Sequence, residues 1–319
     1  MAVLLVWAIV SAAPAAAAGA GGDEAPPAAG APLSPPFAVG LRVLRLVDPS
    51  RSIRLPHGRS EPRTLVTYVR YPALGAPTAT DVADAPPASA AGPFPLVVFA
   101  HGFAVTPTIY SNLLQSWSRA GYVVAAPVFP LENAHAPGGP DESDLVNEPA
   151  DMSFVISRLL AMSGGGSSAL SGLIDPARIA VSGQSDGGET ALAVGYSHKF
   201  RDRRVDAAVI LSGAEMSGVG GFNFTGGPPL LASQGTADTT NQPRFTYAFF
   251  KGARRPKYLL RLLGAGHLPP YTDEQPQLGV VQSVTVAFLD EYLNHSASAP
   301  AQLASFARVP RVATLALEP

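Results

Sequence analysis

A serine at the centre of a G-x-S-x-G pattern is the residue of this sequence with the clearest chemistry. The pattern spans residues 183–187, with Ser185 in the middle, a β-branched run before it and a helix-compatible run, residues 189–194, after it. This order predicts a strand, a sharp turn and a helix, as in a nucleophile elbow. Glycines two positions before and after the serine permit the strained turn that lifts its hydroxyl above the sheet. Because the pattern alone matches by chance in many proteins, the flanking strand and helix make the interpretation specific.

A serine hydroxyl is a weak nucleophile at neutral pH, so it needs a base and an acid that orients the base. Of the six histidines, His267 follows the predicted strand 257–263 in a glycine-containing loop, which can bring an imidazole over the sheet. Asp238 lies just past the predicted strand 229–233. The order Ser185, Asp238, His267 is the one expected of an α/β-hydrolase triad.

Structural roles compete with these assignments. A single histidine is more often structural or solvated, and an aspartate after a strand is often a turn or N-cap residue. Two competing acids, Asp206 and Asp273, lie at a strand start and beyond the histidine. Four histidines lie in polar loops or at helix ends, without the placement of His267: His57, His135, His198 and His295.

An acyl-transfer site also needs two donors for the developing oxyanion. The backbone N–H of Asp186, at the start of the elbow helix, is one candidate, and that of Phe103, after the apolar run 95–100, is the other. Gly102 permits a close approach, and His101 is expected to have a structural hydrogen-bonding role. The Asp186 carboxylate is expected to point away or to be paired, because a negative charge beside an oxyanion is unfavourable.

Four segments resemble the α/β-hydrolase superfamily, and the resemblance covers roughly residues 42–293. The segments are Phe99–Phe103, Ile174–Gly188, Gly235–Asp238 and Gly264–His267. The nearest groups are chlorophyllase-like, dienelactone-hydrolase-like and platelet-activating-factor-acetylhydrolase-like bacterial esterases, which are similar to cutinase-like polyester hydrolases. The sequence differs from the dienelactone hydrolases proper, whose nucleophile is cysteine. It differs from cutinase-like enzymes at Asp186 and by lacking their C-terminal cysteines.

The resemblance implies a serine esterase that cleaves carboxylic esters through an acyl-enzyme on Ser185. A serine peptidase or amidase on the same fold, and an inactive hydrolase-fold binding protein, are the alternatives. Only residues 212–228 separate the two strands between which many lipases insert a helical cap. We therefore expect no cap domain and a cleft walled by loops such as 105–110 and 214–224, open to a bulky, lipid or polymeric ester.

The rest of the chain alternates strands and helices. Strands are expected at 95–100, 122–128, 178–183, 205–211, 229–233 and 257–263, and helices at 109–120, 150–162, 189–194 and 278–293. This alternation indicates an α/β fold with a mostly parallel, doubly wound sheet. Two stretches of alternating polarity, 41–47 and 64–71, predict an antiparallel pair at one edge. The predicted fold is therefore an α/β-hydrolase fold with antiparallel edge strands.

One catalytic domain, residues 37–296, is expected. Residues 1–18 resemble a secretory signal peptide, with an apolar stretch too short to span a bilayer and an Ala/Pro-rich region after it. No Lys or Arg precedes the apolar stretch, so the usual basic region is missing, but we expect a secreted or extracytoplasmic protein. Residues 19–36 predict a flexible Ala/Gly/Pro-rich linker. Residues 297–319 predict a poorly ordered or surface-packed tail.

The composition argues against several kinds of function. The formal net charge is −2 and 14% of the residues are charged, so no basic field favours nucleic acid. The sequence has no cysteine, which excludes disulfides, thiolate metal sites and a cysteine nucleophile. We expect no metal, no cofactor and no stable membrane span, and the oligomeric state stays open.

Overall fold

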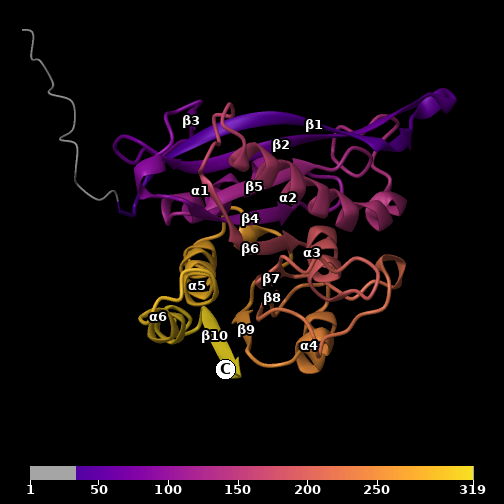
Figure 1. Cartoon of the computed structure of the whole chain (residues 1–319). Helices are drawn as coiled ribbons and strands as arrows, with labels where there is room; N and C mark the ends of the chain where they lie inside the picture. The colour runs from indigo at the N-terminus through magenta and orange to yellow at the C-terminus, as the bar shows by residue number, and fades with distance from the viewer. Residues whose placement is uncertain (1–33, 319) are drawn as a thin grey trace, which may run out of the picture. The chain divides into compact units, whose positions relative to one another are not determined.

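A ten-stranded sheet organises the computed structural model, which describes residues 34–318 (Figure 1). The strand order is β10-β9-β8-β7-β6-β4-β5-β2-β1-β3. The strands are β1 Ala38–Arg54, β2 Ser60–Ala73, β3 Val82–Ala83, β4 Phe94–Ala100, β5 Val123–Val128, β6 Ile174–Gln184, β7 Ala207–Leu211, β8 Leu230–Gly235, β9 Lys257–Leu262 and β10 Ala313–Glu318. The predicted signal peptide and nearly all of the predicted linker lie outside the described residues.

Six neighbouring strands, from β5 through β4 and β6 to β9, pair in parallel. Every residue of β4 and β7 is buried. Such continuous apolar strands are typical of a sheet covered on both faces. The predicted α/β fold with a mostly parallel, doubly wound sheet is confirmed.

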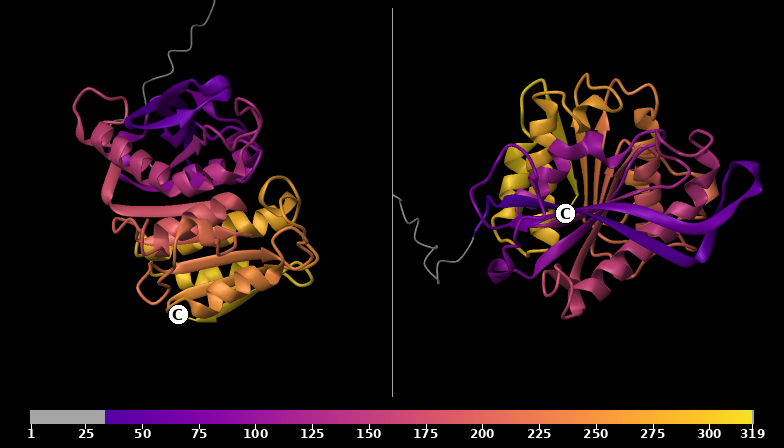
Figure 2. Two further views of the ribbon diagram at one scale, coloured as in Figure 1. Left: turned by 90° about the vertical axis from the view of Figure 1, so that its right-hand side faces the viewer. Right: turned by 90° about the horizontal axis from the view of Figure 1, so that it is seen from above.

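Helices cover both faces of this sheet (Figure 2). The α-helices are α1 Ser111–Arg119, α2 Glu148–Gly164, α3 Asp186–Tyr196, α4 Pro243–Gly252, α5 Gln277–Tyr292 and α6 Ala299–Phe306. Side chains of α1, α5 and α6 pack into one core, and those of α2, α3 and α4 pack into another. Short 3-10 turns complete the set: η1 Pro56–Gly58, η2 Ser89–Ala91, η3 Pro107–Tyr110, η4 Glu142–Asn147, η5 Ser217–Val219 and η6 Pro269–Tyr271.

The antiparallel pair predicted at one edge is formed by β1 and β2. Both strands are longer than the alternating stretches that predicted them, and the hairpin projects beyond the neighbouring strands (Figure 1). Buried ion pairs anchor it: the Arg63 guanidinium lies 2.7 Å from Asp144 and 2.6 Å from Asp151, which belong to η4 and α2. A buried arginine requires such partners, because an unpaired charge is strongly destabilising away from water.

Residues 297–318 pack against the domain, so this segment is not poorly ordered and the domain boundary expected at residue 296 is too early. This segment contributes α6 and β10, and β10 pairs antiparallel with β9 to make a second antiparallel edge. Ala299, Leu303 and Ala307 are fully buried, so the segment covers part of one core. The domain therefore extends past residue 296 because these apolar side chains need the sheet and α5 to leave water.

The connection between β7 and β8 contains only the short turn η5, so no cap domain is inserted between these two strands. The C-terminal ends of the parallel strands are therefore not covered by an inserted helical domain. None of the helices within residues 34–318 has the length and apolar character needed to cross a bilayer.

Candidate active site

Ser185 lies at the turn between β6 and α3, at the C-terminal edge of the parallel strands. Its backbone has φ 57° and ψ −126°, a strained combination for a residue with a side chain. A Cβ at Gly183 would overlap the carbonyl of Gly187, and a Cβ at Gly187 would overlap the carbonyl of Ala100. The two glycines are therefore required by backbone packing, and the predicted elbow is present.

The structure brings together the three side chains that the sequence suggested as a triad. Nε2 of His267 lies 2.8 Å from Oγ of Ser185, and Nδ1 of His267 lies 2.8 Å from Oδ2 of Asp238. Asp238 follows β8 and His267 follows β9, so parallel strand ends deliver both residues to the elbow. The imidazole can thus take a proton from the serine while the carboxylate holds its other nitrogen.

Four hydrogen-bond donors hold the Asp238 carboxylate. Oδ2 accepts from His267 and from the Gln234 amide at 3.0 Å, and Oδ1 accepts the backbone N–H groups of Thr240 and Asn241. Although burial alone would raise the pKa of Asp238, the hydrogen bond and charge of His267, with the other donors, lower it below its ordinary value. Asp238 therefore stays ionised as the partner of the imidazole.

A second set of polar residues, which the sequence analysis missed, positions the elbow against the preceding loop. The Tyr110 hydroxyl donates to Oε1 of Gln184 at 2.8 Å and accepts the N–H of Gly102 at 3.3 Å. The Gln184 amide also donates to the carbonyl of His267 at 3.1 Å. The role of Gln184 could have been suspected, because it directly precedes the nucleophile. No sequence pattern pointed to Tyr110 or Gln234.

The two N–H groups suggested as an oxyanion hole belong to segments in direct contact. A Cβ at Gly102 would lie 3.1 Å from Cβ of Ser185, so the loop that carries Phe103 packs against the elbow. Asp186 is the first residue of α3, where backbone N–H groups lack intrahelical acceptors. Within residues 34–318, the N–H groups of Phe103 and Asp186 have no hydrogen-bond acceptor. Both are free to bind a developing negative charge.

His101 has a structural place in the loop, as expected. Its Nε2 accepts the N–H of Phe129 at 3.0 Å, so Nδ1 carries the proton and donates to the carbonyl of Gly102 at 2.8 Å. Complete burial lowers the pKa of His101 to about 4, so the ring is neutral. This neutral ring fixes the loop before Phe103.

A cavity of about 510 Å³ opens at Ser185. Its apolar walls include the partly exposed rings of Phe103 and Phe245, together with Ala214 and Met216. The complete lining consists of Phe103, Glu142, Ser185, Asp186, Glu189, Ala214, Glu215, Met216, Thr240, Asn241, Phe245 and His267. Residues from the 214–224 loop take part, as expected, whereas those of the 105–110 loop are not among the lining residues.

Carboxyl groups cluster beneath the elbow, which the sequence analysis did not anticipate. Glu132 is fully buried, and burial together with the neighbouring carboxyl groups of Glu148 and Asp186 raises its pKa far above the ordinary value. Burial also raises the pKa of Glu148, despite a 2.7 Å hydrogen bond from Thr190. Neighbouring carboxyl groups cannot all ionise away from water, so Glu132 is protonated. The residues come from separate segments, so no local pattern revealed the cluster.

The Asp186 side chain takes part in this cluster. Its Oδ1 lies 3.5 Å from the Ser185 hydroxyl, and Asp186 contributes to the raised pKa of Glu132. The Asp186 carboxylate therefore does not point away from Ser185, and its neighbour in the cluster is the neutral Glu132. Among residues 34–318, no group of three His, Asp or Glu side chains is arranged to hold a metal ion.

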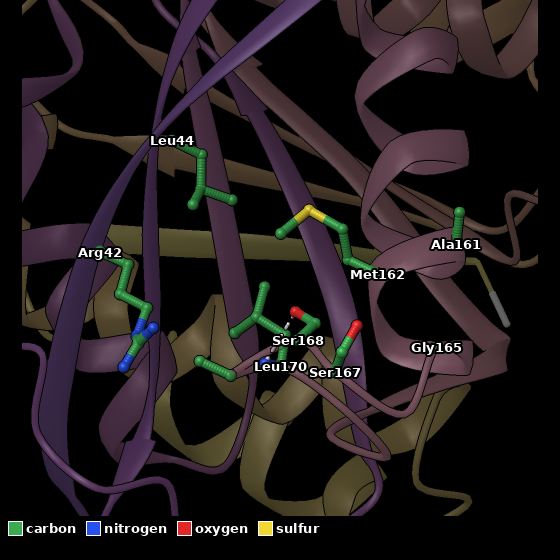
Figure 3. A pocket seen from close by; sticks show the side chains of 9 residues that line it. Arg42, Leu44, Ala161, Met162, Gly165, Ser167, Ser168 and Leu170 are labelled. Atoms are coloured by element: carbon green, nitrogen blue, oxygen red, sulfur yellow. Dashed lines mark hydrogen bonds between the residues drawn. The ribbon is translucent and has the colours of Figure 1, made fainter.

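A separate cavity of about 360 Å³ lies under β1 (Figure 3). Leu44, Met162 and Leu170 give it an apolar interior, and Arg42 lies at its side. It adjoins the segment that leads into β6, whereas Ser185 follows the end of that strand. It is therefore at the opposite end of β6 from the triad.

Residues 75–217 match the sequence profile of the Chlorophyllase family, a segment that includes Ser185 but ends before Asp238. No curated protein matches the sequence. Among solved structures, a ferulic acid esterase from Streptomyces cinnamoneus aligns with a TM-score of 0.61 and 24% identity, over 82% of this chain and 91% of that chain. The structural match shows the α/β-hydrolase fold.

Proposed function

We propose that this α/β-hydrolase is a serine esterase that acts through Ser185, His267 and Asp238. The observation that carries the proposal is the pair of 2.8 Å contacts joining the serine hydroxyl, the imidazole and the carboxylate beside an open cavity. A serine in this setting has a base for its proton and a fixed acid behind that base. The free N–H groups of Phe103 and Asp186 complete what acyl transfer needs.

In the first half of the reaction, Oγ of Ser185 attacks the ester carbonyl as Nε2 of His267 takes its proton. The carbonyl oxygen becomes an oxyanion, which the N–H groups of Phe103 and Asp186 stabilise. The imidazolium that forms is stabilised by Asp238, and it then protonates the departing alcohol. The product of this half is an ester of Ser185 with the acyl group.

In the second half, His267 takes a proton from water, which attacks the acyl-enzyme. The same N–H groups stabilise the second tetrahedral intermediate, and the imidazolium returns the proton to Oγ of Ser185. The carboxylic acid leaves and the enzyme is restored. Each half uses the same three side chains, so loss of any one disables both.

The competing enzyme class is a serine peptidase or amidase. Its transition states need the same groups, but a site without a cap offers no enclosed surface to select a peptide chain, which favours the esterase. Turnover of a nitrophenyl ester compared with its matched nitroanilide separates these classes. We expect the ester to be cleaved and the amide to be cleaved much more slowly.

An inactive binding protein is the remaining alternative. Labelling with a fluorophosphonate probe tests it, because only an activated serine is phosphonylated at a useful rate. We expect one labelled site, lost in Ser185→Ala, and ester turnover lost with it. An unlabelled wild-type protein without ester turnover would refute the proposed function.

The proposal includes export and access for large substrates. Export is supported by the apolar N-terminal stretch followed by Ala/Pro-rich sequence, and it is tested by the N-terminus of the protein recovered from its host. A processed N-terminus between residues 12 and 20 is expected. Access is supported by the uncapped cavity, so a chain-length panel of nitrophenyl esters, a phospholipid and a polyester film would define the acyl and alcohol range.

A further inference from the structure

We propose that the cavity at Ser185 selects esters that carry a positive charge near the reacting carbonyl and disfavours anionic esters. This inference rests on the proposed esterase function and adds the charge of the substrate to it. The chemical class is an ester whose alcohol bears an ammonium group, with the ammonium held between carboxylates and aromatic rings.

The first observation is the charge of the lining. Four carboxyl side chains line the cavity, those of Glu142, Asp186, Glu189 and Glu215, and its lining residues include no Lys or Arg. Glu142 and Glu215 are exposed and come from different parts of the chain, η4 and the β7–β8 connection. The carboxyls are therefore a property of the assembled cavity and not of one acidic stretch.

The second observation is the burial of two of these acids beside the nucleophile. Asp186 is 8% exposed and Glu189 is 3% exposed, and both line the cavity with Ser185. Because water screens a buried charge little, the Asp186 carboxylate acts on a substrate at Ser185 more strongly than an exposed acid would.

The third observation is the aromatic surface. The rings of Phe103 and Phe245 are 40% and 37% exposed, and both line the cavity. The faces of such rings attract ammonium and guanidinium groups. The guanidinium carbon of Arg244 lies 4.9 Å from the centre of the Phe245 ring, so this ring already attracts one cation. Arg244 itself is exposed and is not a lining residue.

The titration of Glu189 agrees with a negative field. Burial, followed by the charges of Asp186 and Glu142, raises its pKa to about 9, against a hydrogen bond from Asn241. A field that opposes ionisation of one more carboxyl also opposes entry of an anionic substrate. It attracts a cationic one, and the attraction weakens with salt because exposed charges are screened over about 10 Å at 0.1 M ionic strength.

Three butyrate esters of similar size test the proposal. Butyrylcholine carries the ammonium, 3,3-dimethylbutyl butyrate is its neutral carbon isostere, and 3-sulfopropyl butyrate is anionic. At low ionic strength we expect kcat/KM for the cationic ester to exceed that of the neutral one by roughly tenfold, with the anionic ester lowest. In 0.5 M NaCl the cationic preference should fall to about twofold.

Variants identify the charges that act. The double variant Glu142→Gln/Glu215→Gln should lower the cationic-to-neutral ratio of kcat/KM by roughly fivefold. Glu61→Gln is the matched control, because this partly exposed acid pairs with Arg59 and is not a lining residue of the cavity, and it should leave the ratio unchanged.

Equal kcat/KM for the cationic and neutral esters in the wild type, at low and high salt, would overturn the charge selection. An unchanged ratio in a folded double variant would overturn the role of Glu142 and Glu215. Failure of the esterase function itself looks different: none of the three esters would be hydrolysed faster than by Ser185→Ala.

Discussion

The hydroxyl of Tyr110 donates a 2.8 Å hydrogen bond to Oε1 of Gln184, the residue directly before the nucleophile, and accepts the N–H of Gly102 at 3.3 Å. One buried phenol therefore connects the elbow with the loop that carries Phe103. Since the two segments supply the two suggested oxyanion donors, this hydroxyl sets their spacing.

Tyr110→Phe should lower kcat for ester hydrolysis by about tenfold, because the ring still packs but the two donor segments lose their common partner. The protein should also lose about 1–3 kcal/mol of unfolding free energy, since buried polar groups are left unpaired. Steady-state kinetics and denaturant unfolding measure both. Tyr68→Phe, on the edge hairpin, is the control and should change neither; an unaltered kcat in Tyr110→Phe would contradict the positioning role.

Ser185 and His267 should behave as one unit. Each alanine variant should lose activity by a factor of about 10⁴ or more. The double variant should hydrolyse esters about as fast as the less active single variant, because neither residue works without the other. Steady-state rates of the four proteins measure the coupling. Strictly multiplicative losses would show that the two side chains are not catalytic partners.

Asp238→Asn and Asp186→Asn should differ strongly in their effect on activity. Asparagine at 238 cannot hold the imidazole as the carboxylate does, so kcat should fall by a factor on the order of 10⁴ with a small change in melting temperature. Asparagine at 186 keeps the backbone N–H and removes a negative charge 3.5 Å from the serine hydroxyl, so activity should fall modestly or rise. A crippled Asp186→Asn with a nearly silent Asp238→Asn would show that the triad is drawn wrongly.

Glu189 should make the protein less stable as the pH rises. Burial and neighbouring negative charges raise its pKa from 4.5 to about 9, so the folded state binds a proton that the unfolded state releases above pH 4.5. Stability is therefore lost progressively from about pH 4.5 to pH 9. Glu189→Gln is neutral at every pH, so its melting temperature relative to wild type should increase between pH 5 and pH 9. A difference in melting temperature between Glu189→Gln and wild type that stays constant from pH 5 to pH 9 would contradict the assignment.

Leu303 tests the C-terminal segment. It is fully buried in α6, so Leu303→Ala should reduce the unfolding free energy by about 2–5 kcal/mol. Phe306, in the same helix but 41% exposed, provides the control, and Phe306→Ala should have a much smaller effect. Equal losses in denaturant unfolding would mean that α6 does not pack as described.

The elbow and the sheet could be predicted because their signals are local. Gly183, Ser185 and Gly187 lie within five positions, and the strand before them and the helix after them each have their own pattern. Asp238 and His267 could be suggested because parallel strands end at one edge of the sheet, so residues just past two strand ends meet there. The distances between their side chains and Ser185 could not be predicted from the sequence.

The C-terminal elements were missed because each is short. The helix α6 has eight residues, and β10 is a six-residue run whose burial alternates only weakly. Ser298, followed by a proline in the first turn, could have indicated the start of a helix. The segment is rich in Ala and Pro, however, and so resembled the N-terminal linker. Short edge elements gain most of their stability from tertiary contacts, which a sequence pattern does not display.

The carboxyl cluster could not be predicted in any detail. Glu132, Glu148 and Glu189 come from a loop and two helices, and each looks like an ordinary surface acid in its own segment. Only the packing of α2 against α3 brings them together, and only their burial keeps Glu132 protonated.

The contact of Gly187 with the carbonyl of Ala100 has a consequence for engineering. Because backbone touches backbone there, the relation between the elbow and the end of β4 does not depend on the side chains that wall the cavity. Residues such as Met216 and Phe245 can then be randomised with little change in how the reacting carbonyl is held. In a library at these positions, many more variants should change which esters are accepted than should lose phosphonylation of Ser185. The substrate range of this protein can therefore be altered without losing the reactivity of the serine.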